Sequence, residues 1–159
     1  MSRCFTSGMQ RIIIASLYKR NYTFVFHRPG DDMSDHPSGT LTTRTMAMPA
    51  DSNPSGDIFG GWVLSQMDIA AGICSGERAQ CRTVTVSLDG MSFIRPVKIG
   101  DILCVYTEIE GTGNTSIDIH VEAWVQRDRS RRTVKVTEAK FRFVALGADG
   151  RPRPLPATG

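Results

Sequence analysis

The sequence predicts an α+β domain in which one long helix packs on an antiparallel sheet of five or six strands. The first observation is an apolar period of about four helical turns that begins at Phe59. The second is a series of four strand patterns after the helix, separated by turn residues. The third is one short strand pattern before it. This order indicates a single helix lying against a single sheet.

The first strand is expected over residues 41–46, and a loop rich in Pro, Ser, Asn, Asp and Gly follows over residues 49–57. The helix comes next, because apolar side chains recur at helical spacing on one face. These are Phe59, Val63, Met67, Ala70, Ala71 and Cys74. Gly76 is the expected C-cap, since glycine commonly ends helices.

Four strands are expected after the helix. Residues 82–93 alternate in polarity and change phase at Gly90, which predicts a β-bulge. Residues 101–110 begin apolar on both faces, as in a covered strand. Residues 115–126 alternate regularly, with one apolar and one polar face, and residues 133–146 change phase in the middle.

The chain of 159 residues has room for one domain. We assign residues 40–150 to that domain. Residues 1–39 lack sustained periodicity, and we expect them to be a disordered tail or an extension upstream of a start at Met33. A chain beginning at Met33 should therefore keep its activity. The Pro-rich residues 151–159 are expected to form a second tail.

Charge and apolar content exclude several classes of protein. The net charge of +3 is confined to residues 1–32, so the domain is neutral overall and does not resemble a nucleic-acid-binding protein. A cluster of basic residues in the last third fits either a phosphorylated ligand or a protected strand edge. No apolar run is long enough to span a membrane. The four cysteines are scattered, which favours free thiols in a reducing cytoplasm.

Several catalytic arrangements are also absent from the sequence. No G-x-S-x-G nucleophile motif is present, and the glycine-rich segment before the helix lacks the lysine of a phosphate-binding loop. His27 and His36 fall in the expected tail. His120 falls on the polar face of a strand, where a surface histidine is the commoner explanation than a catalytic one. The remaining residues offer no conventional metal site.

The glycine-rich entry to the helix is the strongest candidate site. The first amides of a helix lack internal partners, and Gly60 and Gly61 carry no side chain that would block a ligand. A carbonyl oxygen could be bound there as an oxyanion forms. Asp57, just upstream, could supply a catalytic carboxylate. It could equally serve as the helix N-cap, which is the commoner role on composition alone.

The segment around these residues resembles the signature of hot-dog-fold acyl-CoA thioesterases, specifically the bacterial YciA-like group. The resemblance is carried by residues 48–62 and covers roughly residues 40–156. It continues through residues 65–68, 84–86, 89–93, 95–97, 100–101, 115–117, 124–125, 137–139 and 152–156. The combination is far more specific than a lone D-x-N-x-x-G motif would be.

This resemblance implies a hot-dog fold and hydrolysis of acyl-CoA to a free acid and coenzyme A, without a metal or another cofactor. It implies a homodimer, associated further as a trimer of dimers, with active sites at subunit interfaces. The catalytic carboxylate would be Asp57, and the oxyanion-binding amides would be those of Gly60 and Gly61. The substrate-binding candidates are Asn53, Phe59, Asp89, Phe93, Arg95, Pro96, Thr115, Ser116, Arg131 and Arg132.

Two rival functions use the same fold. A non-catalytic acyl-CoA sensor would bind the ligand without turnover, and the presence of Asp57 argues against it. A hydratase of the same superfamily would need a positioned histidine, which the sequence does not supply. We therefore expect a cytoplasmic acyl-CoA thioesterase.

Overall fold

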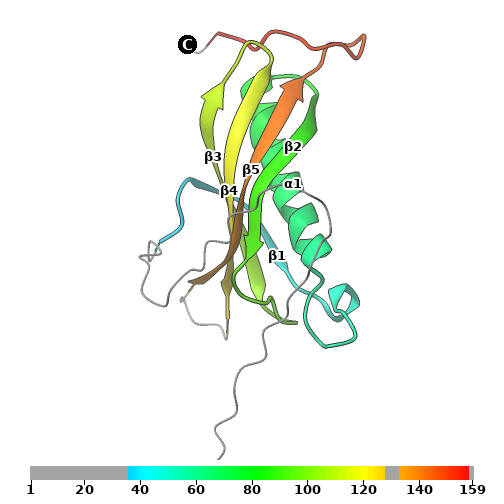
Figure 1. Cartoon of the computed structure of the whole chain (residues 1–159), viewed down its shortest axis with the longest axis vertical. Helices are drawn as coiled ribbons and strands as arrows, with labels where there is room; N and C mark the ends of the chain where they lie inside the picture. Colours follow the sequence, from blue (N-terminus) through cyan, green and yellow to red (C-terminus); the bar gives the residue numbers. More distant parts are fainter. Residues whose placement is uncertain (1–35, 128–132, 158–159) are drawn as a thin grey trace, which may run out of the picture. The chain divides into compact units, whose positions relative to one another are not determined.

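The computed structural model describes residues 36–127 and 133–157 of the chain. The elements follow the order β1 (Thr40–Met46), η1 (Pro49–Asp51), α1 (Gly60–Ala79), β2 (Thr83–Phe93), β3 (Ile102–Thr112), β4 (Ser116–Gln126) and β5 (Thr133–Ala145). The strands form one antiparallel sheet in the order β1-β3-β4-β5-β2, and α1 crosses one face of it (Figure 1). The expected α+β class and single long helix are confirmed, and the described sheet has five strands.

The core lies between α1 and the sheet. The helix contributes Val63, Met67 and Ala70, all nearly free of solvent contact. On the sheet, Phe141 of β5 pairs with Ile119 of β4 and is equally buried. Each large side chain of this kind contributes roughly 1.5–3 kcal/mol when removed from water. The same apolar residues that predict the helix from sequence therefore hold it against the sheet.

The C-terminus of α1 differs from the prediction, because Gly76 is not the C-cap. The helix continues to Ala79, and Gln80 ends it in the left-handed conformation, with φ 52° and its amide bonded to the Gly76 carbonyl at 2.9 Å. A glycine inside a helix costs about 1 kcal/mol. Ser75 and Ala79 are completely buried, and this packing outweighs the weak local propensity.

The strand patterns are largely confirmed. The register of β2 against β5 shifts between Asp89 and Ser92, around Gly90 with its φ of +74°, as the change of phase predicts. Strand β3 is covered on both faces near its start. The predicted polar face of β4 is wrong in its second half, where Glu122 and Trp124 are buried. Ion pairing and hydrogen bonding make that burial possible, as described below.

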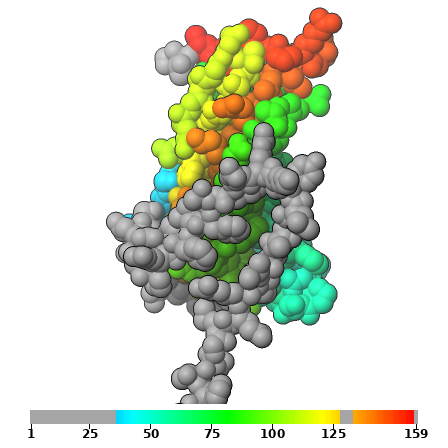
Figure 2. All heavy atoms as spheres, in the orientation of Figure 1, coloured from blue at the N-terminus to red at the C-terminus, as the bar shows by residue number. Residues whose placement is uncertain are grey.

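The Pro-rich C-terminal segment lies against the domain. The amide of Arg153 donates to the Ala145 carbonyl at 2.9 Å, and that of Leu155 donates to Asn114 at 2.8 Å. Figure 2 shows this segment in red beside the yellow hairpin of β3 and β4. Among the described residues, no helix is long and apolar enough to cross a membrane. The predicted N-terminal tail lies mostly outside the described residues.

Candidate active site

A cavity of about 360 Å³ opens beside the N-terminus of α1. Its wall comes from the loop before α1, from the first turns of α1, from the end of β2 with the segment that follows, and from β5. Six of its residues are candidates from the sequence, namely Asn53, Asp57, Gly60, Phe93, Arg95 and Pro96. The other five are Ile58, Val63, Ile94, Val97 and Val136. The cavity therefore combines one carboxylate and one guanidinium with a mainly apolar wall.

Asn53 holds the loop that carries Asp57. Its side-chain oxygen accepts hydrogen bonds from the amides of Ser55 and Asp57, at 2.9 and 3.2 Å. The backbone amide of Asn53 donates to the Asp57 carbonyl at 2.7 Å. Gly56 completes the turn with a φ of +81°, a conformation that favours glycine. Asn53 thus fixes the backbone of Asp57 as well as lining the cavity.

Asp57 does not cap α1, so that interpretation of the residue is wrong. The N-cap is Phe59, which makes no side-chain capping hydrogen bond. The Asp57 carboxylate instead forms an ion pair with the Lys98 ammonium, and its side chain remains one-third exposed. A carboxylate that is not used to cap the adjacent helix remains available for chemistry in the cavity.

The amides at the start of α1 are the candidate oxyanion donors. The Phe59 carbonyl accepts from Trp62 and Val63, at 3.0 and 3.3 Å, whereas the amides of Gly60 and Gly61 have no acceptor within the described residues. A β-carbon built on Gly60 would lie 3.0 Å from Cζ of Phe93, while one on Gly61 would meet nothing within 4 Å. Glycine at position 60 therefore lets the Phe93 ring lie across the helix terminus.

Arg95 lies at the border between the cavity and β5. Its guanidinium donates to the Lys135 carbonyl at 3.1 Å, and its amide donates more weakly to Val136 at 3.4 Å. The side chain is exposed. A guanidinium has five N–H groups, so donors remain for an anionic group that enters the cavity.

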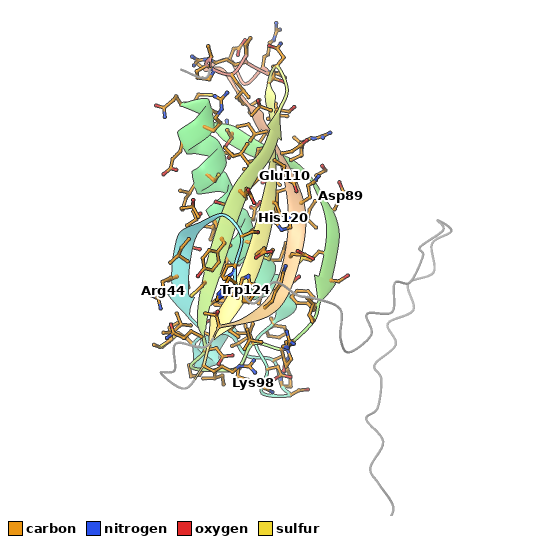
Figure 3. All side chains as sticks on the ribbon, turned by 90° about the vertical axis from the view of Figure 1, so that its left-hand side faces the viewer. Arg44, Asp89, Lys98, Glu110, His120 and Trp124 are labelled. Atoms are coloured by element: carbon orange, nitrogen blue, oxygen red, sulfur yellow. The ribbon has the colours of Figure 1, made fainter. Side chains whose placement is uncertain are left out.

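Four predicted substrate contacts lie outside this cavity in their own chain. Asp89 is on β2, midway along the sheet, whereas Lys98 lies at the end of the sheet (Figure 3). Thr115 and Ser116 lie at the β3–β4 turn, where the Thr115 carbonyl accepts from Ala145. Phe59 is about half exposed beside the cavity. Arg131 and Arg132 lie outside the described residues.

A second polar cluster lies on the face of the sheet away from α1. The possible metal ligands His120, Glu122 and Glu138 have their ligand atoms within 4.8 Å of one another. However, the Lys135 ammonium lies 2.7 Å from Glu122 and 2.8 Å from Glu138. A lysine so placed already supplies the positive charge that a metal would bring. We therefore interpret the cluster as a structural ion network, in which His120 participates.

Sequence reasoning missed Lys98 and the apolar wall of the cavity. Lys98 is 41 positions from Asp57, and a single lysine in a turn carries no local signal. The apolar residues Ile58, Val97 and Val136 resemble ordinary core positions in the sequence. Only the fold shows that they lie beside the carboxylate.

Known proteins resemble this chain over most of its length. A family profile described as the thioesterase superfamily matches residues 55–131. The chain is 50% identical over 130 residues to the acyl-CoA thioester hydrolase YciA of Salmonella typhimurium, which covers 80% of this chain and 98% of that protein. It is 49% identical over 123 residues to the acyl-CoA thioester hydrolase YciA of Escherichia coli, covering 76% and 93%.

Solved structures show the same arrangement of elements. The hexameric thioesterase from Yersinia pestis is 49% identical, with a TM-score of 0.74 over 77% of this chain and 100% of that chain. A hexameric broad-specificity acyl-coenzyme A thioesterase is 43% identical, with a TM-score of 0.73 over 78% and 86%. The acyl-CoA hydrolase of Staphylococcus aureus, crystallised with butyryl coenzyme A, is 27% identical, with a TM-score of 0.68 over 72% and 70%.

Proposed function

Because this chain belongs to the thioesterase superfamily, we propose that it hydrolyses acyl-CoA thioesters to a free carboxylic acid and coenzyme A. Its relatives at about half identity are named acyl-CoA thioester hydrolases, and the match covers nearly their whole length. The hot-dog fold of these enzymes is the fold described above. The observation that carries the proposal is the Asp57 carboxylate in one cavity with the exposed start of α1.

The proposed reaction places the thioester carbonyl at the start of α1. As the carbonyl carbon becomes tetrahedral, negative charge develops on its oxygen, and the amides of Gly60 and Gly61 would stabilise that charge. The positive end of the helix dipole adds to the effect. The C–S bond then breaks, and the departing sulfur takes a proton to form the thiol of coenzyme A.

Asp57 can serve this reaction by two routes. As a general base, its carboxylate takes a proton from the water that attacks the carbonyl carbon. As a nucleophile, it attacks the carbonyl itself, and water then hydrolyses the mixed anhydride. Both routes need the charge of Asp57. Single-turnover hydrolysis in oxygen-18 water tests the second route, because label enters Asp57 only when water attacks the Asp57 carbon of the mixed anhydride.

The decisive experiment is turnover of a panel of acyl-CoA esters, followed with a free-thiol reagent. We expect thiol release by the unmodified chain and at least ~100-fold lower kcat in Asp57→Asn, on the scale of a lost general base. Binding of a non-hydrolysable acyl-CoA should survive in the variant, since the helix amides are unchanged. Binding without turnover in the unmodified chain would instead establish a sensor.

We further propose a homodimer as the active unit and a trimer of dimers as the full assembly. Hexameric relatives support this, as does the position of Asp89, Thr115 and Ser116 outside their own chain's cavity. In such an assembly these residues, with Arg131 and Arg132, would contact coenzyme A bound at a neighbouring subunit. We propose a cytoplasmic reaction without a metal or another cofactor, since a carboxylate and helix amides supply the groups it needs.

A further inference from the structure

Asp57 has an ionic partner, Lys98, to which the proposed reaction assigns no role. The Lys98 ammonium contacts Oδ1 of the Asp57 carboxylate. Among the described residues, no other side chain donates a hydrogen bond to this carboxylate. The Lys98 side chain is 53% exposed and that of Asp57 33%, so the pair lies at the solvent boundary of the site.

The backbone brings the two residues face to face. Asp57 and Lys98 form an isolated antiparallel β-bridge, and the next residue, Ile58, donates its amide to the Val97 carbonyl at 3.0 Å. This bridge joins the loop before α1 to the turn after β2. The ion pair is therefore a cross-strand pair on a short piece of sheet, and such opposite-charge pairs are neighbours by geometry.

Hydrogen bonds to Asp101 stabilise the turn that carries Lys98. The Lys98 amide donates to the Asp101 carboxylate at 2.9 Å, and the Asp101 amide donates back to the Lys98 carbonyl at 3.0 Å. Asp101 is only 5% exposed and pairs with the Arg127 guanidinium at 3.0 Å. Gly100, with its φ of +88°, permits the tight turn between them. These hydrogen bonds hold the Lys98 backbone in place independently of the contact between its side chain and Asp57.

From this geometry we infer that Lys98 is a positioning residue for the Asp57 carboxylate, an inference that rests on the proposed function. The ammonium binds Oδ1 and so fixes the orientation of the carboxylate, which leaves Oδ2 for the attacking water or the thioester carbon. An exposed ion pair contributes only about 0–1 kcal/mol to stability. Its larger effect should be on the rate, because misplacing a reacting group by about 1 Å can cost up to ~100-fold.

Steady-state kinetics of Lys98→Met and Lys98→Arg test the inference. We expect kcat to fall about tenfold in Lys98→Met, with KM within about twofold of the unmodified chain, because orientation acts on the chemical step. Lys98→Arg should restore kcat to within about threefold, since a guanidinium can reach the same oxygen. In the Asp57→Asn background, Lys98→Met should lower the residual rate no further.

Lys140→Met is the matched control. Lys140 is 51% exposed and pairs with Glu110 on the sheet, so the variant also removes an exposed lysine ion pair, but one whose residues do not line the cavity. We expect its kcat and melting temperature to match those of the unmodified chain. The melting temperature of Lys98→Met should also change little, which separates positioning from folding.

The outcomes that would overturn this inference can be told apart from the outcome that would overturn the proposed function. An unchanged kcat in Lys98→Met, with Asp57→Asn inactive, would overturn the inference and leave the proposed function standing. A raised KM with unchanged kcat would also overturn it, and would make Lys98 a contact for the anionic substrate. If the unmodified chain failed to release thiol from any acyl-CoA, the proposed function would fall and the role of Lys98 with it.

Discussion

At the residue scale, the two glycines at the start of α1 have different surroundings although they are neighbours in the sequence. A methyl group on Gly60 would press on the Phe93 ring at 3.0–3.2 Å, whereas one on Gly61 meets open space. Both positions have helical geometry, where alanine is favoured over glycine by up to about 1 kcal/mol. Substitution of either glycine by alanine should therefore change stability little, whereas activity should fall more at Gly60 than at Gly61.

We predict that Gly60→Ala loses about tenfold in kcat, a fraction of the 100-fold or more that removal of an oxyanion donor costs. The cause of this loss is that the added methyl group displaces the Phe93 ring, which lies beside the amides at the start of α1. Gly61→Ala should lose less, and neither variant should melt below the unmodified chain by more than a few degrees. Parallel kinetics and thermal unfolding check this. Equal losses in the two variants would show that the Phe93 contact does not matter.

The same scale shows what sequence can predict about the site. Asp57, Gly60 and Gly61 lie within five positions, so one motif predicts that they lie together, and the structure places Asp57 and Gly60 in one cavity. Asp57 is separated from Lys98 by 41 positions, and only the bridge between two loops joins them. Contacts of this kind depend on how two loops pack together at the end of the sheet. The periodicity of the sequence within each loop does not predict that packing.

At the element scale, alternation predicts the strands correctly but fails to predict burial on the outer face of β4. Trp124 donates its indole N–H to Glu122 at 2.8 Å, and the Lys135 ammonium lies 5.9 Å from the centre of the Trp124 ring. Polar residues on a strand usually indicate a solvated face. Here they satisfy one another across β4 and β5, so the face can be covered.

This ion network gives the protein a predictable acid sensitivity. Burial, the largest influence, raises the pKa of Glu122, but hydrogen bonds from Lys135, Trp124 and the Ser38 amide together lower it to about 2, from 4.5. A carboxyl group whose folded pKa is depressed stabilises the fold above its unfolded pKa. That stability is lost as pH falls through the folded value. The window therefore runs from about pH 4.5 down to about pH 2.

We predict that Glu122 accounts for up to about 3 kcal/mol of the free energy of unfolding lost across this window. Glu122→Gln should lack this part of the acid dependence. It should also be about 3 kcal/mol less stable at pH 7, because Lys135 keeps a buried charge without its main partner. Urea unfolding at a series of pH values measures both effects.

Asp118→Asn is the control for the acid experiment. Asp118 pairs with Arg142 at 2.6 Å on the exposed part of the same face, and exposed pairs contribute about 0–1 kcal/mol. Asp118→Asn should therefore lose little free energy of unfolding at pH 7. An acid dependence in Glu122→Gln identical to that of the unmodified chain would assign the transition to other carboxylates.

At the scale of the whole molecule, the sheet has one edge suited to a second copy of the chain. Strand β2 is eleven residues long, and its outer edge has no partner strand among the described residues. Val86 on this strand is 53% exposed, and Phe93 at its end forms part of the cavity wall. Strand β1, at the other edge, has only seven residues and therefore offers fewer backbone groups for pairing than β2.

We predict that chains pair through β2 and that the dimer is the smallest active species. Light scattering across a dilution series should give multiples of the 17.5 kDa chain mass, and specific activity should fall only where monomer forms. Val86→Arg should shift dissociation to higher protein concentration, because it places a charge in the contact. Leu41→Arg, an equally simple change on the exposed edge of β1, should leave the dimer intact. A fully active monomer, or a dimer weakened by Leu41→Arg alone, would contradict pairing through β2.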